Sequence, residues 1–338
     1  MGAHWNTVTA LESVILAGES LTVRSGVGSM RLRLLAPRYW LTWLGLGLLR
    51  LLALLPFGAI VRLGRWLGVV LRHLPLGFLE TARRNIELCL PELSSAERER
   101  LLKEHFASLG IALLEIPFAW WSPPERLAKL VRLEGTEHLR AALARGRGAM
   151  VLTAHFTSLE MAGRALTHVA TIGFLYRPPK NEVIAYAFER FRVGFGGHGI
   201  PRDDIRAFIG ALRNNECVWY APDQSYRKKG AEMVPLFGIP AASNTLTSRL
   251  ARVTGAPVLP YFFHRLPGSR GYLGVIHPPF EDFPSESAIA DTARFYRMIE
   301  AQVRLVPEQY LWIHRRFKGL TKDYPDYYGR QAPRHTTS

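Results

Sequence analysis

The chain has 338 residues, more than a single small domain needs, so it can bury a sizeable core. Hydrophobic residues make up 48% and charged residues 21%, a balance that excludes a mainly disordered protein. Two cysteines, Cys89 and Cys217, are too few to staple a chain of this length. The 43 Lys and Arg against 28 Asp and Glu give a formal charge of +15, which predicts anionic partners: nucleic acid, acidic lipid, or acidic proteins and substrates.

The N-terminal part of the chain favours a membrane surface among these partners. Residues 1–29 lack the basic and apolar regions of a secretory signal, and we expect a poorly ordered extension there, with Met30 as an alternative start of translation. From Met30 to Asn85, nine arginines stand against one acid, Glu80, and they are interspersed with leucine rather than with glycine or serine. Residues 30–75 are therefore predicted to anchor the protein to a membrane bilayer.

Residues 39–61 are the strongest candidate for a hydrophobic membrane helix. They carry a single charge, Arg50, and about 20 apolar residues suffice to cross a bilayer. On insertion Arg50 costs about 2.5–3.5 kcal/mol and the leucines return about 3–5 kcal/mol, so crossing the membrane and lying in its interface both remain open. Pro56 is a site where the helix can kink or end. A buried leucine-rich core helix is the third alternative.

The rest of the chain alternates between two periodic patterns. Residues 94–116 carry apolar side chains at helical spacing after a serine, which predicts a capped amphipathic helix. Short apolar runs then alternate with helical patterns; the runs predicted as strands are 149–154, 172–176, 217–221, 256–264 and 271–277. This alternation predicts an α/β fold with a largely parallel sheet flanked by helices. We place the main domain at 76–320 and a polar, poorly ordered tail at 321–338.

His155 and Glu160 are the strongest candidates for catalysis. His155 directly follows a predicted strand, and open α/β sheets build their sites at the carboxyl ends of their strands. A histidine there can take a proton from an alcohol, while Glu160 on the next helical turn can hold its tautomer. The alternative is structural: Thr157 to Glu160 also fits a capping box, in which the carboxylate only bonds the start of a helix. Spacing alone leaves the two open.

Several catalytic signatures are missing from the sequence. There is no G-x-S-x-G elbow, H-E-x-x-H, Walker loop or paired C-x-x-C, so no sequence motif indicates a serine acyl-enzyme, a zinc site or a P-loop. One G-x-G-x-x-G runs from Gly194 to Gly199, but it follows a predicted helix, which indicates a flexible turn rather than a nucleotide site. We expect neither a metal nor a cofactor.

Three polar clusters follow predicted strands or close the chain, and loops beyond strands converge on one edge of a sheet. They are Tyr176, Arg177 and Asn181, with Arg192 one helix later; Asp223 and Gln224, followed by Arg227, Lys228 and Lys229; and His314, Arg315, Arg316 and Lys318. Singly, each is more typical of a solvated loop or a structural ion pair. Together, beside His155, they predict a site at this edge.

The ordered motifs resemble the late acyltransferases of lipid A biosynthesis, the bacterial lauroyl- and myristoyltransferase family within the lysophospholipid acyltransferase group. The motifs that carry the resemblance are PRYWLTWLGLGLL (37–49), RRNIELCLPELS (83–94), HFTSLE (155–160), YRPPKN (176–181), VWYAPDQ (218–224), VPLFGIPAA (234–242), LARVTGAPVLP (250–260) and PEQYLWIHRRFK (307–318). The resemblance covers residues 37–318. It implies a glycerolipid acyltransferase-like fold and makes 76–320 an acyltransferase catalytic domain.

The resemblance also implies an activity. The enzyme would sit at the inner membrane with its catalytic domain facing the cytoplasm, and it would move a fatty acyl chain from acyl carrier protein to a hydroxyl of a lipid A precursor. His155 would be the general base and Glu160 its partner, while Arg192 and Asp223 match further functional positions of the family. We add Arg177 as a phosphate or oxyanion contact. A thioester needs no covalent acyl-enzyme, and a +15 protein attracts both an acidic carrier and a phosphorylated acceptor.

Two alternatives compete with this interpretation. One is an acyltransferase acting on another membrane lipid, such as lysophosphatidate, ornithine lipid or a mannosylated lipid. The other is a non-catalytic basic protein that binds membranes or nucleic acid; against nucleic acid, the basic residues lack aromatic interleaving on a recognisable module. The sequence does not determine the acyl-chain length, the sugar position or the oligomeric state.

Overall fold

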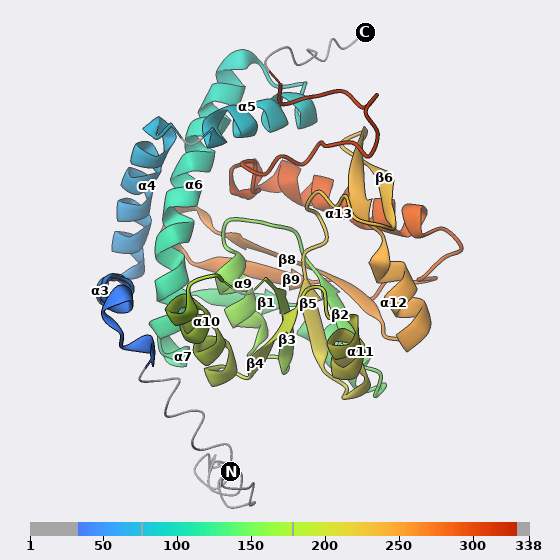
Figure 1. Cartoon of the computed structure of the whole chain (residues 1–338), viewed down its shortest axis with the longest axis horizontal. Helices are drawn as coiled ribbons and strands as arrows, with labels where there is room; N and C mark the ends of the chain where they lie inside the picture. Colours follow the sequence, from blue (N-terminus) through green and yellow to red (C-terminus); the bar gives the residue numbers. More distant parts are fainter. Residues whose placement is uncertain (1–32, 76, 178, 330–338) are drawn as a thin grey trace, which may run out of the picture.

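The structure is a computed structural model that describes residues 33–75, 77–177 and 179–329, except for the side chain of Arg192 (Figure 1). Its longer helices are α3 (Trp40–Leu52), α4 (Phe57–His73), α5 (Phe78–Cys89), α6 (Ser95–Trp121), α7 (Pro124–Ala128), α8 (Thr136–Leu143), α9 (Leu159–Leu166), α10 (Glu182–Gly194), α11 (Ile205–Arg213), α12 (Leu246–Thr254) and α13 (Ala288–Leu305). Single 3-10 turns are η1 (Pro37–Tyr39), η2 (Pro267–Ser269) and η3 (Pro307–Gln309).

One mixed sheet forms the centre of the molecule. The strands are β1 (Val131–Glu134), β2 (Ala149–Leu152), β3 (Ile172–Tyr176), β4 (Gly197–Pro201), β5 (Cys217–Tyr220), β6 (Ala231–Leu236), β7 (Ile239–Asn244), β8 (Val258–Arg265) and β9 (Tyr272–Ile276). Seven of them pair in the order β1-β9-β8-β2-β5-β3-β4, and every pairing is parallel except β8 with β9. β6 and β7 form a separate hairpin. The predicted α/β class with a largely parallel sheet is confirmed.

Helices cover both faces of this sheet, so its strands alternate between two hydrophobic clusters. In β2, Met150 and Leu152 belong to one cluster, whereas Ala149 and Val151 belong to the other. Successive side chains of a strand point to opposite faces, which is why a continuous apolar run serves both. The first cluster includes residues of α11, α12 and α13, and the second includes residues of α8 and α9.

The predicted single hydrophobic helix over 39–61 is wrong. α3 ends at Leu52, the chain turns, and α4 begins after Pro56. Proline lacks the N–H that a continuing helix would need, and its fixed φ suits a helix start. At 1.5 Å per residue, α3 is only about 20 Å long, short of the roughly 30 Å of hydrocarbon. In the part of the chain that the structure describes, we find no helix both long and apolar enough to span a bilayer.

α4 is held against α6 by direct backbone contact. A Cβ placed on Gly110 would lie 2.1 Å from the Gly64 carbonyl oxygen, and one on Gly68 would lie 2.2 Å from the Phe106 oxygen. No side chain fits there, so the two helices approach as closely as backbones allow. α6 itself begins with the predicted serine cap, because Ser94 and Glu97 form a reciprocal capping box. The segment predicted to anchor the protein to a membrane is thus packed on the main domain and not separate from it.

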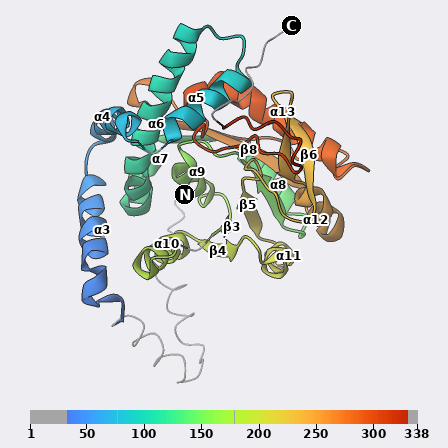
Figure 2. The ribbon, with the colours of Figure 1, turned by 45° about the horizontal axis from the view of Figure 1, so that its top comes forward.

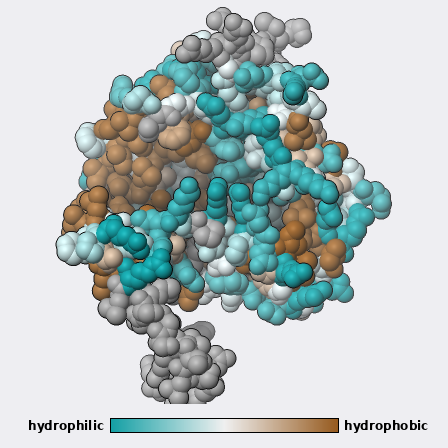
Figure 3. Space-filling model, viewed as in Figure 1, coloured by the Kyte–Doolittle hydropathy of each residue, from teal (hydrophilic) through white to brown (hydrophobic). Residues whose placement is uncertain are grey.

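The outer faces of α3 and α4 form an apolar surface. Its exposed members, which we call the α3–α4 face, are Trp40, Leu41, Leu44, Leu48, Leu51, Leu54, Leu63, Trp66, Val69 and Val70. None of the α3 residues is buried. Figure 2 shows α3 at the periphery of the molecule, and Figure 3 shows brown, hydrophobic surface on this side. An exposed apolar patch of this extent indicates a binding face.

Two further expectations differ from the structure. Gly197 and Gly199, interpreted as part of a flexible turn, lie in edge strand β4. Glycine is needed at both positions, since a Cβ there would clash with the rings of Phe174 and Tyr176. Residues 321–329, expected as a poorly ordered tail, pack on the core: the Tyr328 hydroxyl donates to Asn85 Oδ1 at 2.6 Å. Residues 1–32 and 330–338 lie outside the described part of the chain, so the predicted extension and the end of the tail stay predictions.

Candidate active site

Two neighbouring strands bring a histidine and a carboxylate together. β2 and β5 are paired in parallel, with Leu152 opposite Tyr220. His155 and Asp223 each follow three residues later, so they leave the same edge of the sheet side by side. Asp223 was predicted as a substrate-binding or transition-state residue; the strand order gives it the place beside His155.

Asp223 accepts three hydrogen bonds. Its Oδ1 accepts from His155 Nδ1 at 2.5 Å, and its Oδ2 accepts from the His155 backbone N–H at 3.0 Å and from the Tyr310 hydroxyl at 3.2 Å. The Asp223 side chain is 2% exposed, whereas the His155 ring is 23% exposed. Tyr310 was not predicted as a site residue, although it lies in the PEQYLWIHRRFK motif. A buried carboxylate therefore holds a histidine whose ring reaches the surface.

The charges of the pair follow from these contacts. Burial raises the pKa of Asp223, but the charge and hydrogen bonds of His155 outweigh burial, so the pKa lies below its usual value. Burial lowers the pKa of His155, and the Asp223 charge and hydrogen bond more than reverse that effect, so the pKa is raised. An ionised carboxylate only accepts, so Nδ1 carries the proton. In the neutral ring the lone pair is then on Nε2.

Backbone bonds fix the loop that carries His155. The Leu311 N–H donates to the His155 carbonyl at 2.9 Å, and the Thr157 N–H donates to the Gln309 carbonyl at 2.7 Å. The segment after η3 thus runs beside the loop like a further strand, with a bridge between Phe156 and Tyr310. These bonds fix the position of the His155 ring. A catalytic base must be held in place in this way.

Glu160 occupies a different environment from the one predicted. The carboxylate on His155 Nδ1 is Asp223, whereas Glu160, in the first turn of α9, accepts from Trp120 Nε1 at 3.2 Å. The capping-box alternative is wrong: the N-cap of α9 is Ser158, which makes no side-chain cap bond, and the Thr157 hydroxyl bonds Ser108 at 2.7 Å. The Thr157 N–H also donates to Gln309, so the predicted Thr157–Glu160 capping box is not formed.

An aromatic hollow of about 90 Å³ opens beside Glu160. Its walls come from α6, α9, β3, β5 and the segment around α10; they include Trp120, Phe174, Phe191, Phe195 and Trp219, with Glu160 and Arg164 as the charged members. Trp120 stacks on Phe191 with ring centroids 5.0 Å apart. Gly163 forms part of the floor, where a Cβ would lie 3.0 Å from Phe174 and 3.1 Å from Trp219. Its aromatic lining suits an apolar ligand group.

Cations from three loops gather at the same edge of the sheet. Arg177 follows β3, Arg202 follows β4 and Lys228 lies beyond β5, and all three are exposed. The Lys228 ammonium is 2.9 Å from Asp203, and the Arg202 guanidinium is 3.8 Å from it. The Lys228 hydrogen bond and the charges of Lys228, Arg202 and Arg177 together lower the pKa of Asp203. Arg192 lies in α10, but its side chain is outside the described part.

The C-terminal cluster divides into buried and exposed members. Arg315 and Lys318 are exposed, whereas Arg316 is 3% exposed and donates to the Ala242 carbonyl and to the Ser243 and Tyr296 hydroxyls. Burial lowers the pKa of His314 to about 4, and its Nε2 accepts from the Ser225 N–H. His314 is thus neutral and structural, which leaves His155 as the candidate base between the two histidines that line this crevice.

Fold and site together define an α/β protein with a histidine–carboxylate pair at the carboxyl edge of its sheet and an apolar hollow lined by Glu160. The sequence model of the family described as bacterial lipid A biosynthesis acyltransferase matches residues 29–319. The chain belongs to this family, and it is an acyltransferase.

Curated relatives agree with this assignment. The chain is 39% identical to the lipid A biosynthesis palmitoleoyltransferase of Escherichia coli K12, over 84% of this chain and 93% of that protein. It is 37% identical to the lauroyltransferase of the same strain, over 87% and 97%, and 28% identical to its myristoyltransferase, over 83% and 88%. The three names carry three different acyl groups, so similarity alone does not assign a chain length. A 1-acyl-sn-glycerophosphate acyltransferase structure from Thermotoga maritima matches with 19% identity and a TM-score of 0.35, over 68% of this chain and 97% of that one, a level that supports no argument.

Proposed function

We propose that this enzyme transfers a fatty acyl chain from acyl carrier protein to a hydroxyl of a lipid A precursor, forming an acyloxyacyl ester. The observation that carries the proposal is the His155–Asp223 pair, with Nδ1 held at 2.5 Å and the ring partly exposed. The family and the names of the relatives support the acceptor.

The proposed chemistry uses the lone pair of His155 Nε2. Nε2 removes the proton of the acceptor hydroxyl while its oxygen attacks the thioester carbonyl, and Asp223 stabilises the imidazolium that forms. The tetrahedral intermediate then expels the carrier thiolate as the C–S bond breaks, and His155 returns the proton to sulfur. No covalent acyl-enzyme is needed. Base catalysis supplies about 10²–10⁴-fold, so cationic donors such as Arg177 or Arg192 are proposed to stabilise the oxyanion.

The acyl chain is proposed to occupy the aromatic hollow. Its apolar walls lie next to Glu160 at the start of α9, five residues after His155. Glu160 remains a proposed catalytic residue: a carboxylate at this position can accept a hydrogen bond from the incoming hydroxyl and so orient it towards His155. The Trp120 N–H holds the carboxylate for that purpose.

The α3–α4 face is proposed to hold the enzyme in the inner membrane, with the catalytic domain facing the cytoplasm. Its leucines and tryptophans would enter the lipid interface, because α3 and α4 are separate short helices with a turn between them. Arg38 and Arg62 would meet acidic headgroups, whereas Arg65 and Arg72 pair with Glu104 and Glu99 of α6. The interfacial alternative left open by the sequence is thus the one we favour.

An assay with purified full-length enzyme tests this function. Acyl carrier protein carrying one acyl chain is offered with tetra-acylated lipid A precursor or with lysophosphatidate, and products are identified by mass spectrometry. We expect acyloxyacyl product from the first acceptor. Product formed only from lysophosphatidate would instead establish an acyltransferase for another membrane lipid.

A further inference from the structure

The cations at the carboxyl edge of the sheet outnumber their acids. Arg177, Arg202 and Lys228 surround one carboxylate, Asp203, and all three are exposed. Arg227 and Lys229 flank Lys228 and are exposed as well. We call these five residues the basic rim. Asp203 and its exposed neighbour Asp204 cannot neutralise five cations, so the rim keeps a positive field.

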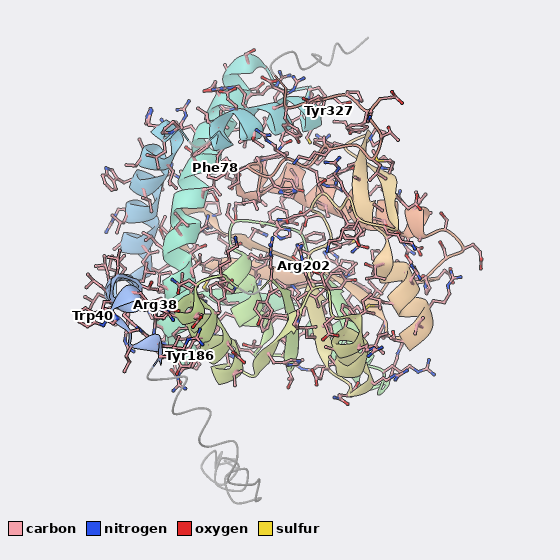
Figure 4. The ribbon with its side chains drawn as sticks, in the orientation of Figure 1. Arg38, Trp40, Phe78, Tyr186, Arg202 and Tyr327 are labelled. Atoms are coloured by element: carbon pink, nitrogen blue, oxygen red, sulfur yellow. The ribbon has the colours of Figure 1, made fainter. Side chains whose placement is uncertain are left out.

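The basic rim lies near the catalytic pair and apart from the α3–α4 face. Lys228 follows Asp223 by five residues in the same loop, and Arg202 directly follows β4, the strand next to β3. Figure 4 shows Arg202 over the middle of the molecule, whereas Arg38 and Trp40 lie at the α3 side. Hydrophilic surface covers this region in Figure 3. A partner bound at the rim reaches His155 from the water side while the membrane helices stay in lipid.

The exposure of the rim side chains favours a protein over a headgroup. Side chains are 50% exposed for Arg202, 56% for Lys228 and 70% for Asp203. Such protruding, hydrated charges contribute little binding energy one by one, but they steer an oppositely charged surface and orient it. A site built for a phosphate would use bidentate arginine pairs, whereas Arg202 and Lys228 are already directed to Asp203.

We propose that the basic rim is the docking surface for an acidic carrier protein that delivers the acyl thioester. This rests on the proposed function, because it assumes a protein-bound donor. The charge complementarity brings the carrier to the edge of the sheet, where its acyl chain can enter the hollow next to Glu160. Charge reversal at the rim lowers the association rate, so the KM for the carrier rises while the turnover of bound donor is unchanged.

The test compares two donors of the same acyl chain, one on acyl carrier protein and one on pantetheine. The rim variant is Arg202→Glu with Lys228→Glu. The matched control is Arg132→Glu with Arg140→Glu, which makes the same charge change on exposed residues of β1 and α8, at the opposite end of the strand order. We expect the rim variant to raise the KM for the carrier at least tenfold and to flatten its salt dependence, with the pantetheine donor unaffected.

Three results would overturn the proposal. An equal rise of the KM in the control variant would show that the effect depends on the net charge of the protein and not on the rim. A higher KM for the lipid acceptor with an unchanged KM for the carrier would assign the rim to acceptor phosphates. Lost binding to vesicles of acidic phospholipid would assign it to the membrane. The proposed function fails separately: the wild-type enzyme would then use pantetheine donors but no carrier protein, whatever the rim variant does.

Discussion

Two buried ion pairs lie at the ends of β-strands in this molecule, and they differ in what remains free. Arg265, at the end of β8, meets Glu115 of α6 through two bonds of 2.6 and 2.7 Å. Ser108 accepts from the third nitrogen of Arg265, and the Tyr272 hydroxyl donates to Glu115. These two side chains are 7% and 1% exposed. In the His155–Asp223 pair only the carboxylate is enclosed.

The difference indicates which pair can do chemistry. Every nitrogen of the Arg265 guanidinium is used, and both carboxylate oxygens are occupied, so this pair can only hold α6, β8 and β9 together. Within the described part of the chain, the hydrogen bonds of the His155 ring are confined to Nδ1. A fixed ring with one nitrogen left over is what a proton acceptor needs. The burial of the two carboxylates alone would not distinguish the catalytic pair from the structural pair.

The largest expected effect is the loss of activity in His155→Ala. Turnover should fall by about 10²–10⁴-fold, because no other group in the crevice can take the proton. Folding should be retained, since Asp223 keeps its bonds from the Tyr310 hydroxyl and from the backbone N–H at position 155. Steady-state kinetics and the thermal melting temperature measure the two separately, with His138→Ala as a control on α8. Retained activity in His155→Ala would end the base assignment.

Arg265→Met should act on stability instead. It leaves the Glu115 carboxylate buried without its partner, and breaking such a pair costs about 3–5 kcal/mol of unfolding free energy. Chemical denaturation of the detergent-solubilised enzyme measures this loss. At a temperature where the variant is folded, kcat should stay within a few-fold of wild type, because Asp223 holds the histidine. A large drop in kcat with unchanged stability would reverse the roles of the two pairs.

Asp223→Asn should shift the pH dependence as well as the rate. The base works as neutral imidazole, so kcat/KM rises with pH through the pKa of His155, which Asp223 raises. Without that charge, burial dominates and the pKa falls, so the acid limb moves to lower pH while the plateau drops by about 10²-fold or more. The measurement is kcat/KM from pH 5 to 9. An unmoved limb would mean that another group controls it.

Glu160→Gln tests whether this third carboxylate is catalytic, like Asp223, or structural, like Glu115. Its amide oxygen can still accept from Trp120, so packing is preserved while the charge is lost. We expect a fall of about 10²-fold in kcat/KM for the acceptor if the carboxylate orients the hydroxyl. Near-normal kinetics would make Glu160 a structural residue. Gln224→Glu, in the crevice beyond β5, controls for charge changes near the site.

The sequence predicted the residues of the site better than it predicted which carboxylate bonds the histidine. His155 and Asp223 were both found because each follows an apolar run, and the run itself marks a strand. That Asp223 and not Glu160 lies on Nδ1 depends on β2 and β5 being neighbours, and no local pattern reports strand order. Distance along the chain favoured Glu160, five residues away, over Asp223, which is 68 residues away.

The N-terminal helix was misjudged for a related reason. Hydropathy over residues 39–61 sums side chains and ignores the turn after Leu52, although Pro56 was a visible warning. Strand β4 was hidden because its glycines have no apolar side chains; their role is to make room for Phe174 and Tyr176. Both errors come from contacts between segments, which single-segment patterns cannot encode.

Gly163→Ala carries the smallest expected effect and extends the comparison to the acyl hollow. The new Cβ would lie 3.0–3.1 Å from the Phe174 and Trp219 rings, so these rings must move or the floor must rise. One methylene in such a pocket is worth about 1–3 kcal/mol, so the preferred donor should shorten by one or two carbons. Gly210→Ala in α11 is the matched control, since a Cβ there meets nothing within 4 Å and gains the same helix propensity. The preference is measured by competition among carrier-bound chains of ten to sixteen carbons. An unchanged preference with lower overall activity would place the acyl chain outside this hollow.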